Sequence, residues 1–172
     1  MIEYYFQQII CAKLNDWHKK NKTTFEYQPT YPENTTEYFI EKICYHNYQG
    51  WHYEDLGQQS DPEKIIRGWR GSQINNRNRN QTVQSLDHLF SQHNQADAEC
   101  HTESLAVILD KVSILYLKYL HLFNLDLEKA KLLFATVQLL INCTQKLYDD
   151  ILAGRKRSIL FPHAKLYDEV AT

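Results

Sequence analysis

The feature that most constrains the fold of this chain is the segment 103–123, ESLAVILDKVSILYLKYLHLF. The segment is apolar almost all round, which is typical of a helix enclosed by other protein segments. At about 100° per residue, its charged and histidine side chains fall on two neighbouring lines. Glu103, Asp110 and His121 form one line, and Lys111 and Lys118 form the other. We call these five residues the charged seam, which the rest of the chain must either cover or leave in water.

Apolar residues at helical spacing predict four further helices. They cover residues 3–20, a segment that begins between 34 and 36 and ends near 57, residues 62–92, and residues 127–153, with a polar connection at 93–101. The third of the five is the best marked, because Asp61 can cap it and Pro62 suits the first helical position. We therefore predict an all-α fold, an antiparallel bundle of four long helices with a shorter N-terminal helix packed alongside.

Local signals also predict how the helices end. Thr102 is expected to cap the central helix and Asp126 to cap the last one, which Gly154 should end in a left-handed conformation. Gly68 and Gly71 lie inside the third helix, where each glycine costs ~1 kcal/mol. We therefore expect a kink or a close helix contact near these two glycines.

The length of 172 residues suits one domain, in which roughly 70% of the unfolded surface can be buried. With only 5 Gly and 4 Pro, the chain does not have the composition of a turn-rich β protein or of a disordered one. We expect residues 1–172 to form a single helical domain. Within it, residues 1–33 should be a helix and a loop packed on the bundle, and residues 158–172 a C-terminal tail docked by Leu166 and Tyr167.

Composition also argues against several partners. The formal net charge of −2 gives no electrostatic field that would select nucleic acid. The basic run 155–157 is expected to interact favourably with the negative C-terminal end of the last helix dipole. Charges interrupt the apolar stretches too soon for a membrane span, and the N-terminus lacks the features of a signal peptide. We therefore expect a cytoplasmic protein, with no nucleic-acid partner and with its four isolated cysteines reduced.

The third predicted helix contains an unusually polar stretch. Between Arg70 and Thr82 the only large apolar residue is Ile74, although the helix is apolar on both sides of this stretch. Residues spaced by three or four form one polar face there: Gln73, Asn76, Arg77, Asn80, Gln84 and Asp87. This face is either solvated, which is the commoner arrangement, or it closes over the charged seam. In the second case its charges would have to pair with Glu103, Asp110 and Lys111, because burying an unpaired charge costs several kcal/mol.

Five short motifs along the chain carry much of its polar chemistry. They are Trp51-His-Tyr-Glu-Asp55, Asn76-x-x-Arg79, Thr102-Glu-Ser104, Asp110-Lys-Val-Ser-Ile-Leu115 and Ala153-Gly-Arg-Lys156. Together they resemble the motifs of an uncharacterised bacterial family that is known only as a domain of unknown function. The resemblance extends from Trp51 to Tyr167, and Gln73 stands where relatives carry an acid. The family is associated with gene neighbourhoods for glycosyltransferases and envelope polysaccharide, and it has no assigned activity.

The resemblance implies that polar motif residues on several helices could converge in one site. The candidate ligand-binding residues are Glu54, Asp55, Asn76, Arg79, Asp87, Glu103, Asp110, Lys111 and Arg155. Arginine and lysine can hold an anion, while carboxylates can bind hydroxyl groups or Mg²⁺. Such a set suits a phosphorylated or glycan-related small molecule. It equally suits a buried network of ion pairs that stabilises the fold, which is the commoner use of such pairs in bundles.

Established catalytic motifs give little further guidance. The paired Glu-x-x-His motifs of di-iron bundles do not occur, and His52 with Asp55 makes only a pair, so no metal site is predicted. Neither a Gly-rich phosphate loop nor a serine nucleophile elbow is found. The sequence therefore decides neither whether the protein is an enzyme nor which cofactor it would use. Two functions stay open: binding or processing an anionic small molecule in a polar cleft between helices, and a non-catalytic interaction module such as a homodimer.

Overall fold

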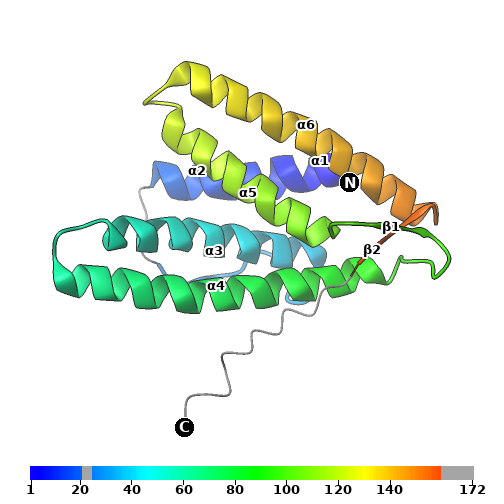
Figure 1. The fold of residues 1–172 in the computed structure, drawn as a ribbon, viewed down its shortest axis with the longest axis horizontal. Helices are drawn as coiled ribbons and strands as arrows, with labels where there is room; N and C mark the ends of the chain where they lie inside the picture. The colour runs from blue at the N-terminus through cyan, green and yellow to red at the C-terminus, as the bar shows by residue number, and fades with distance from the viewer. Residues whose placement is uncertain (21–24, 160–172) are drawn as a thin grey trace, which may run out of the picture.

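The computed structural model of the protein describes residues 1–20 and 25–159, which are mostly helical. Two helical hairpins form the body: α3 (Thr36–Gly57) with α4 (Pro62–Ser91), and α5 (Leu105–Leu122) with α6 (Leu127–Leu152). The N-terminal helix is continuous through α1 (Ile2–Tyr5), a π-helical segment (Phe6–Cys11) and α2 (Ala12–Lys19). In Figure 1, α3 and α4 run side by side along the long axis, and the α5–α6 hairpin crosses them obliquely. The predicted all-α bundle of four long helices with a shorter N-terminal helix is confirmed.

Helix α5 lies at the centre of this arrangement, as its apolar sequence indicates. It packs against α3, α4, α6 and the N-terminal helix. Most of its buried side chains are apolar: Leu105, Ala106, Ile108, Leu109, Val112, Tyr116 and Leu117. They join Phe6, Ile9 and Leu14 of the N-terminal helix in one hydrophobic core. Of the α5 residues only Lys111 and Lys118 are exposed, so the charged seam is partly covered and partly open to water.

Three of the four long helices begin at the residues that the sequence predicts. Side-chain oxygens of Thr35, Asp61 and Asp126 accept hydrogen bonds from the backbone N–H groups of Tyr38, Glu63 and Lys129, at 3.2, 3.0 and 3.0 Å. The expectation for α5 was wrong. Its cap is Ser104, whose hydroxyl oxygen accepts from the backbone N–H of Val107 at 3.2 Å, and not Thr102. The helix begins at Leu105 because the side chain of Asp87, on another helix, holds Ser104 at that position.

The two glycines inside α4 mark a close contact between α3 and α4. A Cβ atom on Gly68 would lie 2.7 Å from the backbone nitrogen of Gly57 and from the carbonyl oxygen of Tyr53. A Cβ atom on Gly71 would lie 2.3 Å from the ring of Tyr53. The predicted close helix contact is therefore confirmed, and it explains why α4 tolerates two residues that disfavour helix interiors.

Two short strands were not predicted. Strand β1 (Glu99–His101) pairs in parallel with β2 (Lys156–Ser158), which places Cys100 opposite Arg157. Gly154 precedes β2 and has a φ of 70°, so the predicted left-handed stop after α6 is confirmed. The first residue of the predicted tail, Ser158, is the last residue of β2, and residues 160–172, including Leu166 and Tyr167, lie outside the described residues. In the described ranges, no helix is both long and apolar enough to cross a membrane.

Candidate functional site

Polar side chains from three helices meet at Asn47 on α3. Its Nδ2 donates hydrogen bonds to Oδ1 of Asp110 at 2.8 Å and to Oγ of Ser113 at 2.6 Å, both on α5. Its Oδ1 accepts a hydrogen bond from Nη1 of Arg79 on α4 at 3.1 Å. We call Asn47, Arg79, Asp110 and Ser113 the three-helix cluster. It brings together two of the predicted site residues, Arg79 and Asp110.

The sequence reasoning missed Asn47, although the chain carries a signal for it. Asn47 follows Ile40, Ile43 and Cys44 at spacings of seven, four and three residues, and all four are buried. A polar residue at core spacing on a helix needs hydrogen-bond partners inside the protein. That requirement points to a polar contact with a neighbouring helix, here α4 and α5.

The two charged residues of the three-helix cluster are incompletely paired. Burial raises the pKa of Asp110, although Arg79, the Asn47 amide and Lys111 act in the opposite direction. Within the described residues, Arg79 makes one side-chain hydrogen bond, to the neutral amide of Asn47. Its Nε is buried without a hydrogen-bond partner there. The cluster therefore joins a carboxylate and a guanidinium through an amide and not through an ion pair.

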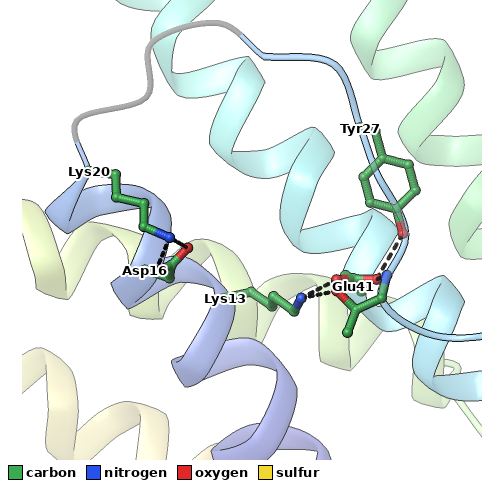
Figure 2. A network of polar contacts seen from close by, with 6 residues as sticks. Lys13, Asp16, Lys20, Tyr27 and Glu41 are labelled. Atoms are coloured by element: carbon green, nitrogen blue, oxygen red, sulfur yellow. Dashed lines mark hydrogen bonds and ion pairs between the residues drawn. The ribbon is translucent and has the colours of Figure 1, made fainter.

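A second buried carboxylate, Glu41 on α3, is much better paired (Figure 2). Its Oε1 lies 2.5 Å from Nζ of Lys13 on α2, and its Oε2 accepts from the backbone N–H of Thr30 at 2.9 Å and from the hydroxyl of Tyr27 at 3.2 Å. Burial alone would raise the pKa of Glu41, but the contacts with Lys13 and Thr30 outweigh it and lower the pKa. This network, which the sequence did not predict, connects the N-terminal helix and the loop after it to α3.

Two further predicted site residues, Glu54 and Asn76, lie near the three-helix cluster. Glu54 accepts a hydrogen bond from the hydroxyl of Ser72 at 2.8 Å. Ser72, Asn76 and Arg79 are four and three residues apart, which places them on one face of α4. The half-buried Asn76 thus lies between the Glu54–Ser72 contact and Arg79. Seven residues of helix span roughly 10 Å, so these groups form a row along α4.

One end of this row opens into a pocket of about 420 Å³. Its lining residues combine aromatic, aliphatic and hydrogen-bonding side chains, among them Tyr53, Glu54, Ile65, Trp69, Ser72 and Gln73. Trp69 is 63% exposed, which is unusual for the largest apolar side chain. The pocket therefore offers an apolar surface beside a carboxylate and several uncharged polar groups.

The other predicted site residues lie apart from the three-helix cluster. Asp87 is buried and accepts hydrogen bonds from the hydroxyl of Ser104 at 2.7 Å and from the backbone N–H of Ala106 at 3.2 Å. These contacts fasten α4 to the first turn of α5. The position of Asp87 on a polar face therefore reflects a helix-capping contact.

The remaining four candidates form local pairs near the surface. Glu103 pairs with Lys111, Asp55 lies 3.6 Å from Nδ1 of His52, and Arg155 pairs with Asp150 at 2.7 Å. Lys111 is exposed and Asp110 is half-buried, so the charged seam is only partly covered at these two residues. Lys111 differs because its long side chain reaches Glu103 at the surface.

The residues of the polar face predicted on the third helix also differ in their exposure to solvent. Gln73, Arg77 and Gln84 are exposed, Asn76 and Asn80 are half-buried, and Asp87 is buried. Among the described residues, no group of three or more His, Cys, Asp and Glu side chains is gathered closely enough to hold a metal ion. The three-helix cluster, with its cationic Arg79 and nearby hydroxyl and amide groups, is instead suited to hydrogen bonding of an anionic or hydroxylated molecule.

Comparison with known proteins adds one finding. Residues 37–159 match the family described as "Protein of unknown function (DUF4254)". No curated protein matches the chain, and no solved structure does. The matched range contains α3 to α6 and both strands, and so every residue of the three-helix cluster. Lys13 and the rest of the N-terminal helix precede it.

Proposed function

The chain belongs to the DUF4254 family, whose function is unknown, and we propose that it binds a small phosphorylated or glycan-related molecule in a polar cleft between α3, α4 and α5. The observation that carries this proposal is the incomplete pairing of Arg79, whose buried Nε has no partner among the described residues. An unsatisfied buried donor costs about 1–3 kcal/mol, and more when the group is charged. An oxygen of a phosphate group would remove that cost through a charge-assisted hydrogen bond.

The pocket beside Trp69 supports the second part of the proposal. Its volume of about 420 Å³ falls within the usual range for small-molecule sites, roughly 300–1,000 Å³. The rings of Trp69 and Tyr53 offer apolar surface, while the Glu54 carboxylate can accept hydrogen bonds from hydroxyl groups. The row from Ser72 to Arg79 would then accommodate a ligand whose hydroxylated part and charged part lie roughly 10 Å apart.

The test is a thermal-shift assay of the purified protein with glucose 1-phosphate, UDP-glucose and inorganic phosphate, with glucose as the uncharged control. At least one phosphate compound should raise the melting temperature, and Arg79→Gln should abolish that shift. The substitution itself should leave stability nearly unchanged, because residues used for binding are often imperfectly paired when the ligand is absent. Arg70→Gln is the matched control, since Arg70 is an exposed arginine on the same helix, and it should retain the shift.

A second candidate function is a non-catalytic oligomerisation module, and one observation favours it. Helix α6 packs against α5, the N-terminal helix and β2, and it leaves Leu132 72% and Leu139 65% exposed. These leucines are seven residues apart and therefore lie on one face of the helix. Sedimentation of the parent chain and of a Leu132→Lys, Leu139→Lys variant tests for a homodimer. Severe destabilisation by Arg79→Gln, with no compound stabilising the parent, would favour this second function.

A further inference from the structure

A second polar pocket lies between α3 and α4, away from the three-helix cluster. Its volume is about 440 Å³, and its lining residues are Phe39, Lys42, His46, Asn78, Gln81, Thr82 and Ser85. None of them is a predicted site residue or a member of the three-helix cluster. His46 directly precedes Asn47 on α3, so the two side chains point about 100° apart around the helix axis. The pocket therefore occupies another side of the α3–α4 interface.

The hydrogen bonds around His46 fix which of its ring nitrogens carries the proton. Asn75 Nδ2 donates to the backbone oxygen of His46 at 2.7 Å, which turns Asn75 Oδ1 toward the histidine ring. That oxygen lies 2.9 Å from Nδ1 of His46 and can only accept, so Nδ1 must donate. In the neutral ring Nε2 then carries a lone pair.

This lone pair has no partner among the described residues. His46 is 5% exposed, it lines the pocket, and its Nε2 is buried without a hydrogen bond there. Burial is the main reason that the pKa of His46 is lowered to about 4; Asn75 raises it, and Lys42 and Arg79 lower it further. The ring is therefore neutral at pH 7. A base with so low a pKa removes protons inefficiently at that pH, so Nε2 is suited to accepting a hydrogen bond.

The other lining groups define what could bind beside Nε2. Lys42, one turn before His46, donates to the hydroxyl of Tyr38 at 3.2 Å and has no carboxylate partner among the described residues. The hydroxyl groups of Thr82 and Ser85 donate to the backbone oxygens of Asn78 and Gln81, at 2.8 and 3.0 Å. Their own oxygens keep lone pairs that can accept from a ligand. The pocket thus presents the Lys42 cation, acceptors on His46, Thr82 and Ser85, and the side-chain amides of Asn78 and Gln81.

We propose that this pocket binds a small molecule that carries both a hydroxyl group and an anionic group. The hydroxyl donates to Nε2 of His46, and the anionic group pairs with the ammonium of Lys42. This inference goes beyond the function proposed for the cluster around Arg79, because the two sites have no residue in common. Each can therefore fail without the other.

The probe for the experiment is glycerol 3-phosphate, which carries both groups, and inorganic phosphate and glycerol each carry one. Long-range ¹H–¹⁵N spectra of the histidine rings of the full chain should show the Nε2 resonance of His46 moving on addition of glycerol 3-phosphate. Its dissociation constant should be at least about tenfold lower than that of either single-group probe, as expected for one added charge-assisted hydrogen bond. Lys42→Met should weaken binding by about the same factor.

A matched variant separates this site from its surroundings. Lys64→Met removes an exposed lysine of α4 and should bind glycerol 3-phosphate like the parent. An unmoved His46 resonance, equal binding of glycerol and glycerol 3-phosphate, or undiminished binding by Lys42→Met would overturn the proposal. None of these readouts requires a His46 variant, whose loss of the Asn75 contact could impair folding.

Discussion

The acidic side chains of Glu41 and Asp110 are both withdrawn from solvent, yet their environments have opposite effects. Glu41 is fully buried, but a lysine, a backbone N–H and a tyrosine hydroxyl contact its two oxygens, and its pKa is lowered. Asp110 is less buried, but its side chain accepts from one neutral amide, and its pKa is raised. The comparison shows that the number and charge of the donors, together with burial, decide whether an interior carboxylate is stabilised.

This difference separates two uses of polar residues inside a helical bundle. The Glu41 network gives its carboxylate an ion pair with Lys13 and hydrogen bonds from Thr30 and Tyr27, which is expected of a contact that stabilises the fold. Among the described residues, the three-helix cluster leaves Arg79 with a buried donor unused and Asp110 without an ion-pair partner. Residues that bind ligands often break the rules of good pairing in this way. The following predictions test that division, beginning with the largest effect.

Glu41→Ala should produce the largest loss of stability. It leaves Lys13 partly buried without its counterion, and it removes the acceptor of Thr30 and Tyr27. Breaking a buried ion pair by removing one partner costs about 3–5 kcal/mol. Urea unfolding followed by circular dichroism measures this change. A loss below about 1 kcal/mol would show that the Glu41 network contributes little to stability. Glu41 would then not differ from Asp110 in its structural role.

Asn47→Ala should have the next largest effect, about 2–3 kcal/mol, because it removes the amide that connects α3 to both α4 and α5. Asp110 and Arg79 would each lose a hydrogen bond, and a buried group left unsatisfied costs about 1–3 kcal/mol. Asn76→Ala is a matched control, since Asn76 is a half-buried asparagine on α4. The same urea titration compares the two variants. Equal losses of unfolding free energy for both variants would mean that the hydrogen bonds of Asn47 stabilise the fold no more than the contacts of Asn76 do.

Asp110→Asn should change stability at neutral pH by less than about 1 kcal/mol. The amide keeps an oxygen that can accept from Asn47, and it removes a charge that burial disfavours. Differential scanning calorimetry of parent and variant provides the comparison. A loss as large as that expected for Glu41→Ala would place Asp110 among the well-paired structural carboxylates.

The pH dependence of stability should differ in sign between the two acids. The pKa of Glu41 is lowered below its usual 4.5, so its contribution is present above that value and is lost as pH falls through the folded-state pKa. The pKa of Asp110 is raised above its usual 3.8, so its contribution is present below that value and is lost as pH rises through the folded-state pKa. On acidification, the parent should lose its advantage over Glu41→Gln and gain stability relative to Asp110→Asn. Unfolding curves measured from neutral pH to below the unfolded-state pKa values of both acids test both signs.

Local sequence signals were sufficient for most of the fold. Helix spans, the caps at Asp61 and Asp126, and a start of α3 between residues 34 and 36 depend on residues within one turn, so the sequence predicts them. The cap of α5 was wrong because a distant residue, Asp87, selects Ser104 over Thr102. The strand pair β1–β2 was missed because its partners are 57 residues apart in register, Glu99 opposite Lys156, and each strand is too short to show a periodic pattern.

The candidate site was harder to predict, for a related reason. Helical spacing identifies the face on which a polar residue lies, but not which residue of another helix it meets. Arg79 and Asp110 were therefore found, whereas the amide of Asn47 that connects them was not. His46 and Asn75 went unnoticed because their mutual contact depends on the close approach of α3 and α4. For Asn47 and His46, the overlooked signal was a polar residue inside the apolar pattern of α3; Asn75 lies in the polar stretch of α4 and gave no such signal.

The smallest expected effect comes from an exposed ion pair with geometry close to that of Glu41. Lys20 lies 2.7 Å from Asp16 one turn earlier on the N-terminal helix, and both side chains are about half-exposed; the pair is drawn beside Glu41 in Figure 2. Water screens such a pair and competes for its hydrogen bonds, so Lys20→Ala should cost less than about 0.5 kcal/mol. The measurement is the same urea titration, repeated at high salt, which should leave this small difference smaller still. A cost approaching that of Glu41→Ala would mean that the short ion-pair distance, and not burial together with the hydrogen bonds from Thr30 and Tyr27, accounts for the stability assigned to the Glu41 network.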